Sequence, residues 1–113
     1  MKKVGLIGCG AIGKVLAEAI EQKIVICDEL IIFDLDRSKA QKLKNAMNFP
    51  VKVAATLEEL LSAKTEVIVE AAGQRAVQEY YSKLLASEAE LIFMSTGALL
   101  NLNIADPRIH FPA

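Results

Sequence analysis

The 113-residue sequence has few of the residues that build metal sites and disulfide frameworks. It holds one histidine, His110, and two cysteines, Cys9 and Cys27, which lack CxxC spacing and the company of further histidines. We therefore expect neither a metal site nor a disulfide scaffold. Unpaired cysteines are typical of a reducing compartment, so the sequence favours a cytoplasmic protein.

Long runs of one charge and long apolar runs are also missing. The 13 basic and 14 acidic residues are interspersed, with no basic tract that could follow a nucleic-acid backbone. No apolar stretch approaches the ~18 residues that span a bilayer. The apolar stretch 4–8 before Cys9 is shorter than the roughly 7–15 residues of a signal-peptide core. We expect no nucleic-acid partner and no membrane association.

Alternating strand and helix patterns fill most of the chain, which is 53% hydrophobic. Apolar runs predict strands at 4–7, 29–33, 51–55, 66–72 and 91–94, and helical periodicity predicts helices at 12–22, 38–47, 57–62 and 74–87. Such alternation favours one α/β domain over residues 1–98, a doubly wound Rossmann-type parallel sheet of about five strands in the order 3-2-1-4-5. Residues 99–113 show neither period and predict an irregular C-terminal tail.

Two packing expectations follow from these patterns. The first helix is expected to bury one apolar face, made of Ile12, Val15, Leu16, Ala19 and Ile20. The fifth strand is expected to leave its edge unpaired, because no further strand is predicted after it. An open edge and an uncovered sheet face predict self-association or a separate substrate-domain partner.

A glycine-rich motif, GxGxxG, spans Gly8 to Gly13 between the first strand and the first helix. In this setting Gly8 permits the tight turn, Gly10 lets backbone approach a pyrophosphate, and Gly13 allows close packing of helix on strand. The free amide groups at the helix N-terminus then meet the phosphates. The motif alone is a weak signal, but its position between a strand and a helix predicts a dinucleotide site.

Asp34 ends the second strand, 21 positions after Gly13. A carboxylate there accepts hydrogen bonds from the adenosine ribose hydroxyls, which favours NAD over NADP. Arg37 lies three residues further on and could pair with a 2′-phosphate. The cofactor is thus predicted to be NAD or NADP, and Asp36 is expected to cap the following helix.

The fourth and fifth strands end in loops that face the same crevice, Ala72-Gly73-Gln74 and Ser95-Thr96-Gly97. Their glycines either let backbone approach a ligand or simply terminate the strands. Glu70 could point into the core or the crevice. Cys9 is expected to be a small filler in the glycine loop, and His110 an exposed tail residue without a carboxylate partner.

Three segments together carry a family resemblance: residues 4–14, 69–74 and 94–98. Over roughly residues 2–98 the chain resembles the N-terminal part of L-aspartate dehydrogenases, and it is similar to the homoserine dehydrogenase nucleotide-binding domain. The resemblance implies an NAD- or NADP-dependent oxidoreductase acting on L-aspartate in NAD biosynthesis. It implies cofactor contacts at Gly10, Ala11, Ile12, Asp34, Ala72, Gly73, Gln74, Thr96 and Gly97.

The resemblance stops after residue 98. In the family, the substrate domain and the catalytic histidine follow this point, whereas here the sequence loses its pattern. His110 has no matching surroundings, so no catalytic residue is assigned. A truncated or shifted reading frame, or a shortened domain, would explain the sequence. Two hypotheses remain: the cofactor half of an aspartate-dehydrogenase-like enzyme, inactive without its substrate half, or a stand-alone dinucleotide-binding or sensing module.

Overall fold

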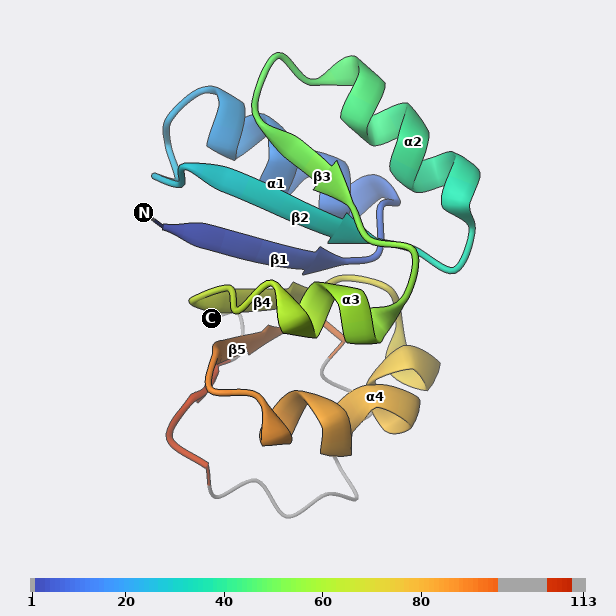
Figure 1. Cartoon of the computed structure of the whole chain (residues 1–113), viewed down its shortest axis with the longest axis vertical. Coiled ribbons are helices and arrows are strands. Elements are labelled where there is room, and N and C mark those ends of the chain that lie inside the picture. The colour runs from blue at the N-terminus through green and yellow to red at the C-terminus, as the bar shows by residue number, and fades with distance from the viewer. Residues whose placement is uncertain (1, 96–105, 111–113) are drawn as a thin grey trace.

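A computed structural model describes residues 2–95 and 106–110 of the chain. Within these residues, six parallel strands form one sheet in the order β3-β2-β1-β4-β5-β6 (Figure 1). The strands are β1 (Lys3–Ile7), β2 (Glu29–Phe33), β3 (Val51–Val53), β4 (Val67–Glu70), β5 (Glu90–Phe93) and β6 (Ile109–His110). The predicted Rossmann-type order is confirmed, with one strand more than the five expected.

In the described part of the chain, four helices connect the strands: α1 (Ala11–Glu21), α2 (Arg37–Ala46), α3 (Leu57–Ser62) and α4 (Gln74–Ala86). They lie on both faces of the sheet, with α1 behind it and α3 in front in Figure 1. Two apolar clusters fill the space between the layers. One joins α1 and α2 to the sheet through residues such as Leu6, Ile20 and Leu43. The other joins α3 and α4 through Leu60, Leu84 and Phe93. None of the described helices is long and apolar enough to span a membrane.

The strand register brings three loops to one edge of the sheet. Ile7 of β1 pairs with Phe33 of β2 on one side and with Glu70 of β4 on the other. Because the strands are parallel, the residues that follow these three positions leave the sheet side by side. The glycine loop, Asp34 and the loop after β4 therefore meet at the carboxyl ends of the central strands, where ligands bind in open α/β sheets.

The first helix is rotated relative to the sequence prediction. Its buried residues are Gly13, Ala17 and Ile20, whereas Ile12 and Val15 are 50% and 65% exposed. The expected inward face was therefore wrong at these two positions. Small residues at 13 and 17 let the helix axis lie close to the sheet. This close packing, and not the size of the apolar side chains, determines which face of the helix is buried.

The edge of β5 is paired, contrary to expectation. Ile109 and His110 of β6 lie beside Leu91 and Ile92. Arg108 holds this short strand in place: it pairs with Asp106 at 2.7 Å and donates to the carbonyls of Leu85 and Ser87 at the end of α4. The arginine lowers the pKa of Asp106 to about 2. A two-residue strand fixed by a salt bridge has no periodicity, so the sequence pattern could not reveal it.

Candidate functional site

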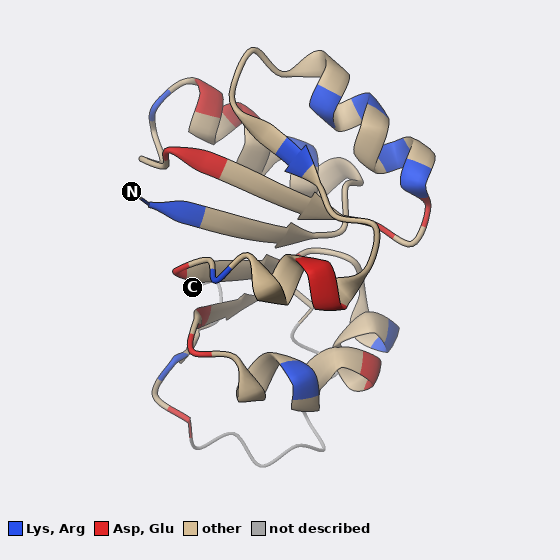
Figure 2. Ribbon diagram, in the orientation of Figure 1, with Lys and Arg blue, Asp and Glu red and all other residues tan. Residues whose placement is uncertain are grey.

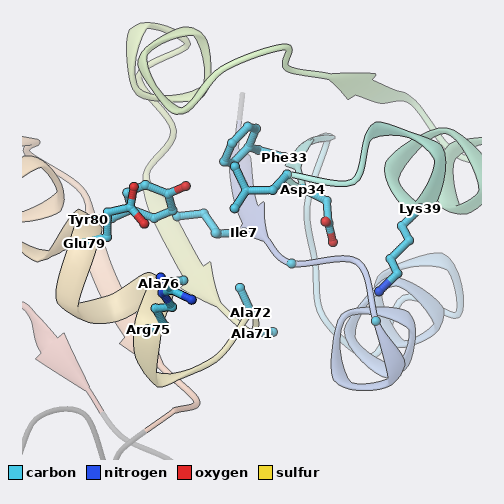
Figure 3. Close-up of a pocket in the computed structure, with 13 residues that line it drawn as sticks. Ile7, Phe33, Asp34, Lys39, Ala71, Ala72, Arg75, Ala76, Glu79 and Tyr80 are labelled. Carbon is cyan, nitrogen blue, oxygen red and sulfur yellow. The ribbon is translucent and has the colours of Figure 1, made fainter.

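A cleft of about 510 Å³ opens at the carboxyl ends of β1, β2 and β4 (Figure 3). Its floor is apolar, and its polar groups come from the surrounding loops and helix starts. The lining residues are Ile7, Gly8, Gly10, Phe33, Asp34, Leu35, Lys39, Ala71, Ala72, Arg75, Ala76, Glu79 and Tyr80. A mostly apolar concave site with a few convergent polar groups is typical of cofactor binding.

Two glycines of the loop are required by the protein itself. Gly8 has a φ of +97°, and a Cβ there would lie 2.6 Å from the backbone nitrogen of Ala72. A Cβ on Gly13 would lie 2.4 Å from the carbonyl oxygen of Gly8. Both distances are too short for any side chain. The roles predicted for these residues, a tight turn and close packing of helix on strand, agree with this geometry.

Gly10 differs, because nothing in the protein requires a glycine there. A Cβ on Gly10 would have no neighbour within 4 Å, and its φ of −81° suits any residue. Gly10 is the N-cap of α1, which receives no side-chain cap and has no acidic residue in its first turn. The first amide groups of this helix therefore have no side-chain cap, as an anion site needs.

Asp34 closes the cleft beside the glycine loop. One carboxylate oxygen accepts a hydrogen bond from the amide of Cys9 at 2.8 Å, and the other accepts from the amide of Asp36 at 2.8 Å. A carboxylate has about four acceptor sites, so two are left for the two hydroxyls of a ribose. Asp34 thus holds the glycine loop and still has acceptors to offer.

A second carboxylate, Glu70, holds the opposite wall from beneath. Its side chain is 1% exposed. It accepts hydrogen bonds from the amides of Ala72 and Gly73, at 2.9 and 2.8 Å, and from the amide and hydroxyl of Ser95. Glu70 therefore ties the loop after β4 to the end of β5. Gly73, with a φ of +137°, then starts α4 without a side-chain cap.

Comparison with known proteins identifies the family. Residues 8–106 match the model of the homoserine dehydrogenase NAD-binding domain. The chain belongs to this family. It is 33% identical over 105 residues to an L-aspartate dehydrogenase of Methanococcus maripaludis, covering 92% of this chain and 39% of that protein. The chain thus spans about two fifths of the length of this relative.

Solved dehydrogenases share the fold of this NAD-binding domain. Malate dehydrogenase of Plasmodium falciparum superimposes with a TM-score of 0.71 at 19% identity, covering 100% of this chain and 45% of that one. Lactate dehydrogenase of Eimeria maxima, solved with NADH and oxamate, gives 0.68 at 17% identity, covering 99% and 43%. At such identities the likeness supports the Rossmann fold.

The structure brings together most of the residues predicted for the cofactor site. Gly8, Gly10, Asp34 and Ala72 line the cleft. Five others stand at the starts of the two helices that border it: Ala11, Ile12, Gly13, Gly73 and Gln74. Arg37 begins α2 and is not among the lining residues. Thr96 and Gly97 lie outside the described residues.

Sequence reasoning missed two cations of the cleft, Lys39 and Arg75. Each stands in the first turn of a helix that follows a crevice strand, α2 and α4 respectively. That position was the available signal, since the first turns of these helices border the ligand edge of the sheet.

Cys9 and His110 take no part in the cleft. Burial raises the pKa of the Cys9 thiol to about 12, so this cysteine is an unreactive packing residue. His110 is not the isolated tail residue expected, because its Nε2 lies 2.7 Å from the carboxylate of Glu90 on the neighbouring strand. Among the described residues, no three His, Cys, Asp or Glu side chains gather in a group that could hold a metal ion.

Proposed function

We propose that this domain binds NAD(H) along the carboxyl edge of its sheet and serves as the cofactor half of an L-aspartate dehydrogenase-like oxidoreductase. The pyrophosphate lies over Gly8 to Gly13, and the adenosine ribose lies at Asp34. The observation that carries the proposal is Gly10. It is a glycine that the protein's own packing does not require, at a helix start without a cap.

The charges around the cleft support an anionic ligand. The N-terminus of α1 acts as roughly half a positive charge, and no acidic residue of its first turn cancels it. Lys39 and Arg75 add two formal positive charges to the lining. A pyrophosphate would meet favourable potential here without any dedicated side-chain ligand.

The adenosine end is set by Asp34 and the residues around it. The two free acceptor sites of Asp34 suit the two ribose hydroxyls. Leu35 and Ala76 line the same cleft and offer apolar surface to an adenine ring. This arrangement favours NAD, because a 2′-phosphate would face the charge of Asp34.

Calorimetric titration with NAD⁺ and NADH tests the proposal. Gly10→Val should abolish binding because the new side chain occupies the space through which the pyrophosphate approaches. It should lower the unfolding free energy by only about 1 kcal/mol, the cost of a poorer N-cap, since nothing outside the adjoining residues lies within 4 Å of the new Cβ. Ser82→Val, on the exposed part of α4, is the control and should bind like the wild type. Unchanged affinity in the Gly10 variant would contradict the site assignment.

Bound NAD⁺ would accept a hydride, but the residues that line the described cleft include no group assigned to the remaining chemistry. Oxidation of an amino acid also needs the substrate held against the nicotinamide and a group to take a proton. His110 pairs with Glu90 and does not line the cleft. We expect the chain alone to bind cofactor without producing NADH from L-aspartate. Turnover that disappears in His110→Ala would overturn this expectation.

The second candidate function is a binding or sensing module without catalysis. Such a module would bind the cofactor at the same site but would not act together with a substrate domain. Exposed Ile12 and Val15 on α1 are available to a contact. Association with a second copy or with a substrate domain stays a prediction, which sedimentation with and without NAD⁺ would test.

A further inference from the structure

The domain buries one carboxylate, Glu70, that neither lines the cleft nor pairs with a cation. Its side chain is 1% exposed at the carboxyl end of β4 and is absent from the cleft lining. Among the described residues it forms no ion pair. Figure 2 shows the densest group of basic residues on α2, which packs against β2 and β3. A buried charge without a counter-ion is costly, so hydrogen bonds must stabilise Glu70.

Hydrogen-bond donors from two loops surround this carboxylate. Its Oε2 accepts from the amides of Ala72 and Gly73, at 2.9 and 2.8 Å. The same oxygen accepts from the Ser95 hydroxyl at 2.8 Å, and Oε1 accepts from the Ser95 amide at 2.9 Å. Three of the four donors are amides, which can only donate, so the ionised carboxylate, with acceptor sites on both oxygens, suits this position.

We propose that Glu70 is a positioning residue for the nicotinamide half of the cofactor. It fixes from beneath the loops that follow β4 and β5, on which that half is bound, and does not touch the ligand itself. The inference rests on the proposed function. It gives Glu70 a part in the affinity for one half of NAD, in addition to its support of the folded loops.

The strand order places these two loops at the nicotinamide end. In the proposed binding mode the adenosine ribose lies at Asp34, after β2, and the pyrophosphate lies on the glycine loop, after β1. Strands β4 and β5 come next in the sheet, so a dinucleotide that crosses the crevice continues over their carboxyl ends. Ala72 lines the cleft. A Cβ on Gly73 would meet nothing outside the adjoining residues within 4 Å, which leaves this backbone open to a ligand.

The two carboxylates at this edge of the sheet use their acceptor sites differently. Asp34 accepts one amide at each oxygen and keeps sites for a ribose. Glu70 accepts from four donors, which fill the about four acceptor sites of a carboxylate. Its burial also separates it from the cleft. Glu70 therefore acts on a ligand only through the backbone that it holds.

Calorimetry with the whole cofactor and with its adenosine half tests the inference. NAD⁺ meets both halves of the crevice, whereas ADP meets only Asp34 and the glycine loop. Glu70→Gln turns N–H groups toward donors that the carboxylate now accepts. It should weaken NAD⁺ binding by about tenfold or more and change ADP affinity by less than about twofold. NADH should weaken by the same factor as NAD⁺, because both oxidation states meet the same loops.

Ser95→Ala is a milder variant that removes only the hydroxyl donor. It should weaken NAD⁺ binding by about threefold and leave ADP binding unchanged. Because this hydroxyl and Glu70 share one contact, the double variant should lose less than the product of the two single losses. Glu66→Gln, at an exposed residue before β4, is the matched control and should bind both ligands like the wild type.

Thermal unfolding shows whether each variant is folded at the temperature of the titration, and Ser95→Ala decides the matter where Glu70→Gln does not fold. Equal weakening of NAD⁺ and ADP would make Glu70 a general support of the domain and overturn the inference. An effect on NAD⁺ without one on NADH would assign Glu70 to the charge of the oxidised ring and overturn it too. Equal wild-type affinity for NAD⁺ and ADP would refute the inference and leave the proposed function standing, whereas failure of both ligands to bind would refute the function itself.

Discussion

The four described helices of this domain begin in two different ways. Helices α2 and α3 start with a side-chain cap: Asp36 accepts from the amide of Ser38, and Thr56 accepts from the amide of Glu59. Helices α1 and α4 start at Gly10 and Gly73, with no side-chain cap and no acidic residue in the first turn. The two uncapped starts border the cleft from opposite walls.

Carboxylates are present near the uncapped helices too, but they bind different amides. Asp34 accepts from Cys9, and Glu70 accepts from Ala72 and Gly73. These amides belong to the loops and N-caps that precede the first helical residues. The loops are thereby fixed while the amides of the first helical turns stay available. The domain thus stabilises these loops from behind and leaves the starts of α1 and α4 without a side-chain cap.

Gly8→Ala should have the largest effect, because it disturbs the loop that precedes α1. The new Cβ would lie 2.6 Å from the Ala72 nitrogen at a residue with a φ of +97°. We expect a loss of about 3 kcal/mol in unfolding free energy from overpacking and backbone strain. Urea denaturation measures it. Gly10→Ala makes the same chemical change in open space and should cost no more than about 1 kcal/mol, because alanine is a poorer N-cap than glycine. Similar losses in the two variants would mean that the two glycines do not differ.

Glu70→Gln should have the next largest effect, because it removes the support behind α4. The buried side chain accepts four hydrogen bonds from donors in two loops. An amide offers one acceptor oxygen and turns two N–H groups toward these donors, so we expect a loss of about 2 kcal/mol. Glu66→Gln, an exposed residue before β4, should be nearly neutral in the same urea experiment. A neutral Glu70 variant would show that the loops are held by other contacts.

Sequence patterns predicted the features that depend on periodicity and on local chemistry. The strand order, the Asp36 cap and the glycine loop each follow from such signals, and the structure agrees with them. The patterns failed where a contact between distant segments decides the outcome. Gly13 packs against Gly8 and turns α1 so that Val15 faces solvent. Arg108 attaches β6 to the end of α4 across 23 residues. Neither contact leaves a period in the sequence.

The sequence also did not predict the orientation of charged side chains. Asp34 was placed correctly at the cleft, but its bond to Cys9 joins residues 25 apart and was not foreseen. Arg37 and Lys39 are both basic residues in the first turn of one helix, and only the position of the Asp36 cap decides which of them faces the cleft. A helix start located one residue away would have exchanged their directions.

Removing a side-chain cap from one helix and adding one to another should give the smallest changes in unfolding free energy. Thr56→Ala removes a cap from α3, whose residues do not line the cleft. It should lower the unfolding free energy by about 1 kcal/mol and leave NAD⁺ affinity unchanged. Gly10→Ser adds a hydroxyl cap to α1, and serine exceeds glycine as an N-cap by only a few tenths of a kcal/mol. A small gain in stability is therefore expected.

The binding result should run opposite to the stability result. The hydroxyl introduced by Gly10→Ser would accept from an amide that the pyrophosphate needs, and the new Cβ would occupy space that is open in the wild type. NAD⁺ affinity should fall at least about tenfold, which corresponds to about 1.4 kcal/mol. Thermal unfolding with and without NAD⁺ measures both quantities in one experiment, because a ligand that binds only the folded state raises its stability. A Gly10→Ser variant that is more stable and binds NAD⁺ as tightly as the wild type would show that the uncapped start of α1 is not reserved for the cofactor.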